Sequence, residues 1–412
     1  MKILFLADNF PPEKNAQASR VYERACYWTD WGNSVTVITC APNFPDGKVY
    51  SGFRNRLRQI QFDTGIKITR VITFIAPNAG RVLRIVDFLS YMVSAFIAGL
   101  LEPRADVVVA TSPQFFAAVA GCTLAAVKRV PFIMEVSDLW PDSIVAVGAM
   151  KHNLAMRWIE KIELYMYRRA ARVVVLTKAF RDNLIRRGVP ATKIDVVING
   201  VDLRRYAPKP KAHALGCTWG IGPKEFVIGY IGTLGMAHGL MNVLAAAERC
   251  GSSIRFLFVG PGAEREALIA EAKRKGLKNV TFVPAQAKER ISDFWSLCDA
   301  ALIHLKNTPL FATVIPSKIF EAMAMGLPLL LVAPRGEASG IVEKENAGIW
   351  VAPDNPHELA NAALLLAGNA ELRMRLAAAS RAAAARYSRE RQAAEMLSSF
   401  ERALMFDLVE KQ

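Results

Sequence analysis

Short runs of apolar, β-branched residues alternate with helical stretches along all 412 residues of this chain. Such runs are typical of strands buried on both faces, and helices between them imply parallel sheets covered on both sides. We therefore predict an α/β protein with two doubly wound sheets. The predicted strands are residues 2–7, 34–39, 66–74, 106–111, 132–136, 171–176 and 193–198 in the first half, and 226–231, 254–259, 280–283, 300–304, 329–332 and 348–351 in the second.

The length exceeds one ordinary domain and is sufficient for two. A turn sequence at residues 199–202, with two prolines shortly after it, marks the linker. In paired doubly wound domains, ligands bind at the carboxyl ends of the strands, so a site is expected in the loops that follow strands. The predicted parts are a first domain over residues 1–205, a second domain over 206–385, and a C-terminal helix over 386–412 that packs back on the first domain.

The composition excludes several classes of protein. Hydrophobic residues make up 52% of the chain, so a full core is available and wholesale disorder is excluded. The six cysteines are scattered without a C-x-x-C pair, which argues against a disulfide framework and fits a reducing cytoplasm. The first apolar run is too short for a signal peptide. No ligand spacing typical of a metal site and no G-x-S-x-G sequence occurs, so we expect neither a metal nor a serine nucleophile.

The positive charge lies mainly in the first half. The net charge is +15; residues 1–205 carry 28 Lys and Arg against 17 Asp and Glu, and residues 206–412 carry 24 against 20. A basic first half favours an anionic partner such as a membrane surface, a diphosphate-linked substrate or nucleic acid. No nucleic-acid-binding motif accompanies the charge, so we predict no nucleic-acid partner. A simple solvated surface and a membrane-facing surface both stay open.

The apolar segment 85–101 is at the short limit for a membrane-spanning helix. It contains Asp87 and two serines, and Arg81 and Arg84 precede it. We predict a core helix or a helix on the membrane surface rather than a span.

Residues 316–328 have the pattern of a phosphate-binding helix start. Ser317 follows a proline where a helix is expected to begin, and Gly326 is placed to end it. Lys318 adds a positive charge to the unpaired N–H groups of the first turn, and the Glu321 carboxylate can accept both hydroxyls of a ribose. This order predicts a nucleotide site. Alternatively, Ser317 is only an N-cap, and Lys318 and Glu321 are surface residues.

Two strand ends in the same half carry glycine turns, which let a backbone approach a phosphate closely. One follows the strand 226–231 and leads to a histidine, and the other follows the strand 254–259. The histidine is either a phosphate contact or an ordinary helix-start residue. The predicted donor-nucleotide site consists of Gly232, Thr233, His238, Gly260, Gly262, Ser317, Lys318 and Glu321.

Two loops of the first half are further candidates. The loop over residues 8–16 lacks G-x-G-x-x-G, which disfavours a standard nicotinamide or flavin dinucleotide site. Lys14, Asn15 and Arg20 are candidate contacts to an acceptor or a diphosphate. Asp138 directly follows a predicted strand, so its carboxylate can bind a sugar hydroxyl or accept its proton. It can equally cap the following turn.

Taken together, these motifs resemble glycosyltransferase family 4. The first-half strings are similar to the branch that builds bacterial O-antigen, capsule and colanic-acid polysaccharides and includes fucosaminyltransferases. The motifs that carry the resemblance are Gly232-Thr233-Leu234-Gly235 with His238-Gly239, Asn199-Gly200-Val201-Asp202, Pro316-Ser317-Lys318-x-x-Glu321 with Gly326-x-Pro328, Ala41-Pro42-Asn43-Phe44-Pro45-Asp46-Gly47 and Asp138-Leu139-Trp140-Pro141.

The resemblance implies a GT-B architecture, in which two Rossmann-like domains face each other across a cleft. The first would bind the acceptor and the second a UDP-sugar donor, with retention of configuration and no cofactor besides the donor substrate. Glu321 would hold the ribose, Ser317 and Lys318 would lie beside the diphosphate, and Asp138 would face the transferred sugar. Gly232 and Thr233 match the donor loop of the family. Asp138 and Lys318 are the candidate catalytic residues.

The chain departs from the family pattern at three places, one of which is the first loop, where Asn15 and Ala16 stand in the region of the usual Gly-Gly. Thr313 stands where the first glutamate of the E-x7-E signature is expected, and a deoxy or N-acetylated sugar, with fewer hydroxyls to satisfy, would fit this loss. Thr233 and His238 stand where a diphosphate-binding Arg and Lys are usual, so the charge must come from Lys318, or secondly from Lys14.

We therefore expect transfer of such a hexose from a UDP-sugar to a polyprenyl-diphosphate-linked saccharide in bacterial surface polysaccharide synthesis, without a metal. The protein would be cytoplasmic and peripheral on the anionic cytoplasmic face of the inner membrane. A UDP-sugar 2-epimerase of the same architecture is one alternative. A non-catalytic partner in a polysaccharide assembly complex is another, which the missing glutamate at Thr313 keeps open.

Overall fold

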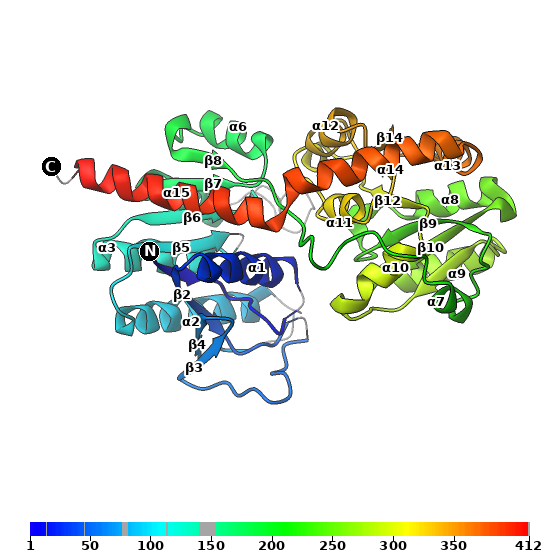
Figure 1. The fold of residues 1–412 in the computed structure, drawn as a ribbon. Helices are drawn as coiled ribbons and strands as arrows, with labels where there is room; N and C mark the ends of the chain where they lie inside the picture. The colour runs from blue at the N-terminus through cyan, green and yellow to red at the C-terminus, as the bar shows by residue number, and fades with distance from the viewer. Residues whose placement is uncertain (14, 45, 76–80, 113, 140–153, 411–412) are drawn as a thin grey trace. The chain divides into compact units, whose positions relative to one another are not determined.

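A computed structural model describes all residues except 14, 45, 76–80, 113, 140–153 and 411–412. It divides the chain into two compact units (Figure 1). The first unit is Met1–Ile198 with Glu390–Gln412, and the second is Asn199–Arg389. The domain boundaries predicted from the sequence, between residues 205 and 206 and between residues 385 and 386, lie a few residues away from these divisions.

The first unit is built on an eight-stranded sheet in the order β3-β4-β2-β1-β5-β6-β7-β8. Neighbouring strands run parallel, with the exception of β3 and β4. Its strands are β1 (Lys2–Leu6), β2 (Ser34–Cys40), β3 (Arg58–Asp63), β4 (Ile66–Val71), β5 (Val107–Ser112), β6 (Phe132–Val136), β7 (Arg172–Val175) and β8 (Ile194–Val196).

The edge strand β3 was not predicted, and it makes the expectation of a purely parallel sheet wrong at this edge. Most of its residues are exposed, including Phe62 at 75%, so it lacks the continuous apolar run of a buried strand. It pairs with β4 across a two-residue turn in which Thr64 and Gly65 both have positive φ. Such turns join antiparallel hairpins.

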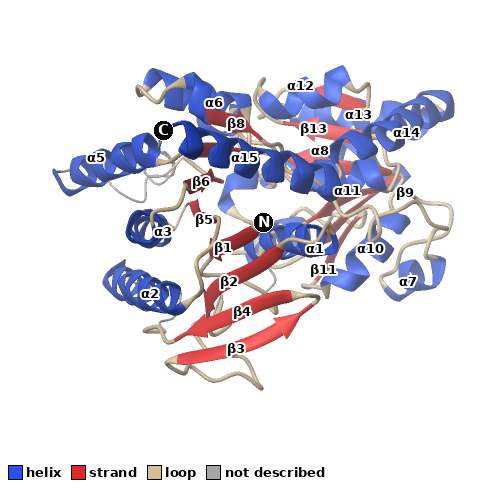
Figure 2. Ribbon diagram, turned by 60° about the vertical axis from the view of Figure 1, so that its left-hand side comes forward, coloured by secondary structure: helices blue, strands red, loops and turns tan. Residues whose placement is uncertain are grey.

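Helices cover both faces of this sheet. Figure 2 shows α2, α3 and α5 along one face and α1 with α15 on the other. The helices of the first unit are α1 (Ala16–Asp30), α2 (Arg81–Leu101), α3 (Phe115–Lys128), α5 (Leu154–Arg169), α6 (Lys178–Arg186) and α15 (Arg389–Glu410).

The C-terminal helix α15 is part of the core of the first unit. The Trp28 indole Nε1 donates to the Ala393 carbonyl oxygen at 2.9 Å, and the Phe400 ring meets the Trp28 ring edge-on at 5.3 Å between centroids. Ala393, Met396, Phe400 and Ala403 all belong to one buried cluster with α1 and the sheet. The structure therefore places this helix on the first unit, where the sequence expected it.

The second unit holds a six-stranded parallel sheet in the order β11-β10-β9-β12-β13-β14. All six strands lie at the residues predicted for them, and the predicted α/β class with two doubly wound sheets is confirmed. Its strands and helices are β9 (Phe226–Ile231), β10 (Ile254–Val259), β11 (Val280–Val283), β12 (Ala300–His304), β13 (Leu329–Val332), β14 (Gly348–Val351), α7 (His213–Thr218), α8 (Met241–Cys250), α9 (Arg265–Arg274), α10 (Ile291–Leu297), α11 (Lys318–Ala324), α12 (Glu337–Lys344), α13 (Pro356–Gly368) and α14 (Ala370–Ala384).

The direction of winding reverses between β9 and β12, because the chain passes from β9 to β10 on one side and from β12 to β13 on the other. The carboxyl ends of strands at such a point leave a crevice between the diverging loops, where ligands of doubly wound sheets bind. The loops after β9 and β12 are therefore the first places to examine in this unit.

The packing of α15 predicts the effect of Phe400→Ala. Removing a fully buried ring leaves a cavity beside Trp28, so the free energy of unfolding of the first unit should fall by about 3 to 5 kcal/mol. Urea unfolding followed by tryptophan fluorescence measures the change. Met405→Ala on the same helix is the control, because Met405 is 66% exposed; an equal loss in both variants would contradict the packing of this helix.

Candidate functional site

The loops that follow β9 and β10 pack directly against each other. Gly232 N donates to the Val259 carbonyl oxygen at 2.9 Å, and Leu234 N donates to the Pro261 carbonyl oxygen at 2.7 Å. Gly260 and Gly262 have φ of +143° and +156°, and a Cβ on either would collide with backbone atoms of the first loop. These two glycines therefore allow the loops to touch.

The side chain of Lys318 reaches into the first of these loops. Its Nζ lies 3.8 Å from the centroid of the Tyr230 ring, and a Cβ on Gly232 would lie only 3.0 Å from it. Among the described residues this Nζ has no hydrogen-bond partner, although it is buried. Burial lowers the pKa of Lys318 to about 7, opposed by the charge of Glu321. A buried cation that makes no hydrogen bond or ion pair is costly unless an anion joins it, so this point is receptive to a negatively charged ligand.

Two histidines lie beside this amine. His238 Nδ1 is 3.2 Å from the His304 carbonyl oxygen, and the His238 ring meets Tyr230 edge-on. Both ring nitrogens of His304 are buried and have no partner within the described part of the chain. Burial lowers the pKa of each histidine to about 4, with Lys318 adding to the effect. Both imidazoles are therefore neutral at pH 7, when each carries one donor and one acceptor nitrogen.

His304 was missed by the sequence analysis because it was read only as the last residue of the apolar strand 300–304. The signal was present: it is a polar residue at the carboxyl end of β12, next to the reversal of winding. Gly239, with φ +58°, lies close to it, since a Cβ there would be 3.5 Å from His304 Cε1. The glycine loop thus meets His304 as well as Lys318.

The helix α11 forms as its start and stop residues predicted, and Gly326 ends it with φ +71°. Ser317 occupies the N-cap position of α11 but makes no side-chain capping bond in the described structure, and its contact to a diphosphate stays a prediction. One Glu321 oxygen, Oε2, accepts from Trp295 Nε1 at 3.3 Å, and the residue is half-buried. Thr313 donates its hydroxyl to the Leu310 carbonyl oxygen at 2.7 Å, within a short turn.

In the first unit, Arg20 has internal partners. Its Nε lies 3.2 Å from Glu135 Oε1, and its Nη2 donates to Ser137 Oγ. Arg24 binds the same carboxylate through two bonds of 2.8 and 2.9 Å. Burial raises the pKa of Glu135, but the two guanidinium groups outweigh it and hold the pKa at about 2. The bond from Arg20 to Ser137 Oγ ties the Arg20–Arg24–Glu135 cluster to the loop that follows β6. Half-buried Asp138 is the next residue in this loop.

The remaining candidates of this unit are at the loop after β1. Asn15 caps α1, since its Oδ1 accepts from Ala18 N at 2.8 Å, and it donates to Asn9 Oδ1 at 2.6 Å. Lys14 lies outside the described residues, as do residues 140–142 of the loop that contains Asp138. Asp8, in the loop just after β1, was not predicted as a site residue. It lies where the direction of winding reverses between β1 and β5, and burial raises its pKa.

Across the described residues, no group of three or more His, Cys, Asp or Glu side chains is placed to hold a metal ion. The structure places Gly232, His238 and Glu321 around the Lys318 side chain in the second unit, beside Tyr230. Two Rossmann-like units, with an anion-receptive amine of this kind in the second, are typical of the GT-B glycosyltransferases.

Comparison with known families agrees with this class. Residues 15–200 match the family described as the glycosyl transferase 4-like domain, and residues 218–383 match the family described as glycosyl transferases group 1. Together these two matches cover most of the chain, which therefore consists of a glycosyltransferase 4-like first domain and a group 1 second domain. The predicted glycosyltransferase of GT-B type is confirmed, and the fucosaminyltransferase-like branch stays a prediction.

Two curated relatives illustrate the range of similar sequences. A glycosyl transferase of Escherichia coli strain K12 named for colanic acid biosynthesis, WcaI, is 24% identical over 337 residues, which are 79% of this chain and 82% of the relative. A D-inositol 3-phosphate glycosyltransferase of Rhodococcus opacus strain B4 is 30% identical over 244 residues, which are 56% of this chain and 53% of the relative. The chain thus has a homologue named for polysaccharide biosynthesis.

Solved structures share the fold over nearly the whole chain. Sucrose-phosphate synthase of Thermosynechococcus elongatus has a TM-score of 0.76 at 18% identity, covering 96% of this chain and 97% of that one. Anabaena HepE in complex with UDP-glucose has a TM-score of 0.72 at 21% identity, covering 97% and 100%. At these identities the likeness shows the fold, and the predicted GT-B architecture is confirmed.

The unpaired amine at this site predicts that Lys318→Met stabilises the ligand-free protein. An apolar side chain of similar length removes an unsatisfied buried group, so the free energy of unfolding of the second unit should rise by about 1 to 3 kcal/mol at pH 6. The unfolded lysine binds its proton up to about pH 10, whereas the folded one loses it near pH 7, so wild-type stability should increase over that range. The advantage of the variant should therefore shrink with rising pH.

Thermal unfolding at pH 6 and pH 9 measures both effects. Lys344→Met is the control, because Lys344 is an exposed lysine of the same unit and should change neither value. A loss of stability in Lys318→Met at pH 6 would mean that the folded protein gives this amine a partner.

Proposed function

We propose that this enzyme transfers a sugar from a UDP-sugar to a polyprenyl-diphosphate-linked saccharide in the synthesis of a bacterial surface polysaccharide. The observation that carries the proposal is the buried Lys318 amine, unpaired among the described residues and in contact with the Gly232 loop. It needs an anion, and Glu321 lies one helical turn away to receive a ribose. The transferred sugar would be a deoxy or N-acetylated hexose, because Thr313 offers a hydroxyl already bonded to Leu310 rather than a free carboxylate.

The second unit would stabilise the departing UDP. When the bond between the sugar and the β-phosphate breaks, negative charge grows on the phosphate oxygens. Lys318 would meet that charge without leaving an earlier hydrogen-bond partner, and neutral His304 would offer its one N–H donor, whereas the N–H of neutral His238 is held by the His304 carbonyl oxygen. A fixed cation at this point would do the work that a metal does elsewhere, so we propose a reaction that needs no metal and no cofactor besides the donor substrate.

The nucleoside would be recognised through Glu321. Its Oε2 accepts from the Trp295 indole, which helps to fix the carboxylate, and ribose hydroxyls would donate to this carboxylate, since an ionised carboxylate can accept about four hydrogen bonds in total. Ser317, Thr233 and the backbone of Gly232 would complete the contacts to the diphosphate.

The acceptor would be bound by the first unit. Asp138 would face the transferred sugar, in a loop whose neighbour Ser137 is tied to Arg20 and Glu135. Retention of configuration would follow if the acceptor hydroxyl attacks from the face that UDP leaves. The acceptor is anchored in lipid, so we propose that the enzyme is cytoplasmic and works at the cytoplasmic face of the inner membrane.

The comparisons favour a transferase over the two alternatives that the sequence left open. Both family matches are to glycosyltransferases, and neither points to a 2-epimerase or to a non-catalytic partner. We therefore keep the transferase as the single proposal.

Glu321→Gln tests the ribose contact. Losing the charged acceptor should weaken UDP binding by about 10-fold or more, in line with roughly 1.5 to 3 kcal/mol for hydrogen bonds to charged groups. Calorimetric titration in EDTA, with ADP and GDP as controls, measures the affinity. The wild type should prefer UDP to 2′-deoxy-UDP, and the variant should lose that preference.

Glu371→Gln, an exposed glutamate in the first turn of α14, is the matched control and should bind UDP normally. No UDP binding by the wild type would reject the donor site. An unchanged preference for UDP over 2′-deoxy-UDP in Glu321→Gln would reject only the role of this carboxylate.

The pH dependence of UDP binding tests Lys318. A diphosphate favours the charged amine, so its pKa of about 7 in the free protein should rise in the complex, and binding should take up a proton above pH 7. Affinity should then fall as pH rises from about 7 to 9, approaching tenfold per pH unit. The phosphates of UDP are already ionised in this range, because their last pKa is about 6.

Titration in buffers of different ionisation enthalpy counts the proton directly. Lys318→Met should bind UDP weakly and without proton uptake, whereas Lys344→Met should behave as the wild type. Affinity that is constant between pH 7 and 9 in the wild type would exclude Lys318 as the diphosphate contact.

A further inference from the structure

The layer of helices α2, α3 and α5 in the first unit has an apolar outer surface. Its largest part lies on α2, where Ile97 is 53% exposed. An exposed apolar patch of this length marks an interaction surface. The exposed apolar residues of α2 are Leu83, Ile85, Val86, Leu89, Val93, Ile97, Leu100 and Leu101.

Residues Leu83–Leu101 are long and apolar enough to cross a membrane, with a mean hydropathy of 1.6. Their inner side is nevertheless part of the fold. Tyr91, Ala95 and Ala98 are buried, and the Tyr91 hydroxyl donates to the Ile38 carbonyl oxygen of β2 at 2.8 Å. A helix held to the sheet in this way can lie along a membrane surface with its outer side inserted.

The helix α5 continues this surface with aromatic and basic residues. Trp158, Ile162 and Tyr165 are exposed and follow one another at the spacing of a single helix face. Lys161 lies over the Trp158 ring, with its Nζ 5.1 Å from the centroid, and Arg169 is one turn beyond Tyr165 on the same face. Trp and Tyr beside Lys and Arg are typical of the boundary between lipid and water.

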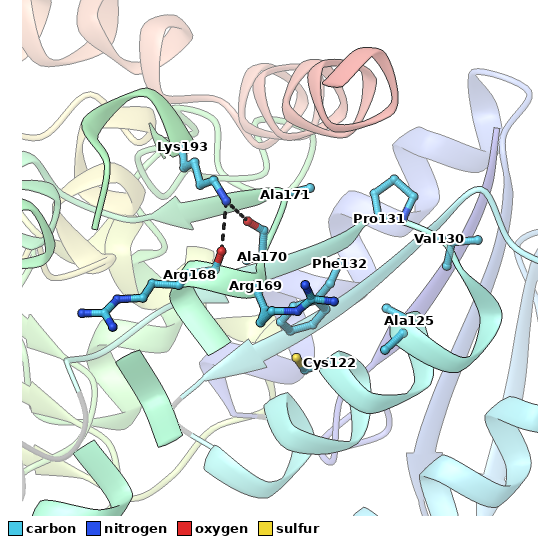
Figure 3. Close-up of a pocket in the computed structure, with 11 residues that line it drawn as sticks. Cys122, Ala125, Val130, Pro131, Phe132, Arg168, Arg169, Ala170, Ala171 and Lys193 are labelled. Atoms are coloured by element: carbon cyan, nitrogen blue, oxygen red, sulfur yellow. Dashed lines mark hydrogen bonds between the residues drawn. The ribbon is translucent and has the colours of Figure 1, made fainter. Parts of the chain in front are cut away.

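A basic pocket of about 280 Å³ lies at the Arg169 end of this face of α5, which we call the Trp158 stripe (Trp158, Ile162, Tyr165 and Arg169). It is bounded by Cys122 in the middle of α3, Phe132 at the start of β6, Arg168 and Arg169 at the end of α5, and Lys193 before β8 (Figure 3). Figure 3 shows the Arg169 guanidinium next to Phe132 and the Lys193 amine on the Arg168 and Ala170 carbonyl oxygens, at 3.0 and 3.3 Å. The lining residues, all of them described, include three cations and no carboxylate.

We propose that this outer face docks on an anionic phospholipid membrane, with the phosphate of one lipid head group in the pocket beside Arg169. The apolar side chains of α2 would enter the acyl region, and the Trp158 stripe would lie at the head groups. Charge complementarity selects this occupant, since an apolar strip bordered by cations matches lipid tails beneath phosphates. The inference rests on the proposed function, because it assigns the surface that holds the enzyme where a lipid-linked acceptor lies.

The test is co-sedimentation of the full chain with vesicles of phosphatidylcholine alone and of equal parts phosphatidylcholine and phosphatidylglycerol. The wild type should bind the anionic vesicles at least about tenfold more strongly. Arg168→Ala/Arg169→Ala should weaken that binding roughly 30-fold, because each basic residue at an anionic surface contributes about 1 kcal/mol. Val93→Gln/Ile97→Gln should weaken binding to both vesicles. Lys273→Ala/Lys278→Ala in the second unit removes the same charge and should bind as the wild type.

Equal binding of the wild type to both vesicles, or unchanged binding of Arg168→Ala/Arg169→Ala, would overturn the head-group site. A lipid-free dimer in analytical ultracentrifugation that Val93→Gln/Ile97→Gln abolishes would assign the face to a second copy of the chain and overturn the docking proposal. Calorimetric titration of UDP with every variant separates this test from the donor site. All of them should keep the affinity of the wild type, so loss of docking and loss of UDP binding are independent results.

Discussion

The close approach of Lys318 Nζ to Gly232, where a Cβ would lie only 3.0 Å from the amine, is the constraint on which the donor site depends. It requires that residue 232 has no side chain, that the Tyr230 ring lies beneath the amine, and that the loop after β9 is held down by the loop after β10. Gly260 and Gly262 satisfy the last condition, because any Cβ there would push the loops apart. Gly232, Gly260 and Gly262 therefore fix the position of the Lys318 amine rather than merely allowing the backbone to be flexible.

The first unit is organised around a different charge. Glu135, at the end of a buried strand, is neutralised by Arg20 and Arg24 from α1, and Arg24 also contacts Met396 Sδ of α15. Removing one member of such a group would leave a buried charge unpaired, which is strongly destabilising. The loop that carries Asp138 is therefore coupled to the C-terminal helix through packed side chains. This coupling also explains why a chain segment beyond the second unit is part of the first.

The strands that were predicted correctly are short runs dominated by apolar residues. This holds for all six strands of the second unit, whereas most residues of the edge strand β3 are exposed and it has no such run. The grouping of Lys318 with Gly232 was also predictable, since both follow strand ends near one reversal of winding. Arg20 was read as a contact for an anionic ligand, but its partner Glu135 lies far along the chain and no local pattern announces it. His304 was missed for a different reason, because it was read only as the last residue of the apolar strand β12 although its polar side chain stands at the carboxyl end of that strand.

The two anion sites inferred for this chain use different cations, and the difference is physically reasonable. The ammonium of a buried lysine can release its proton, so Lys318 need not remain fully charged before a diphosphate arrives. A guanidinium cannot do this, because it stays protonated at any physiological pH, and in the same crevice it would impose the whole cost of a buried charge. Arg168 and Arg169 lie at the surface, where water carries that cost, and there a permanent charge with several fixed donors is suited to phosphate head groups. The substitution Lys318→Arg would therefore leave a permanent buried charge in the ligand-free protein, whatever its effect on the transfer reaction.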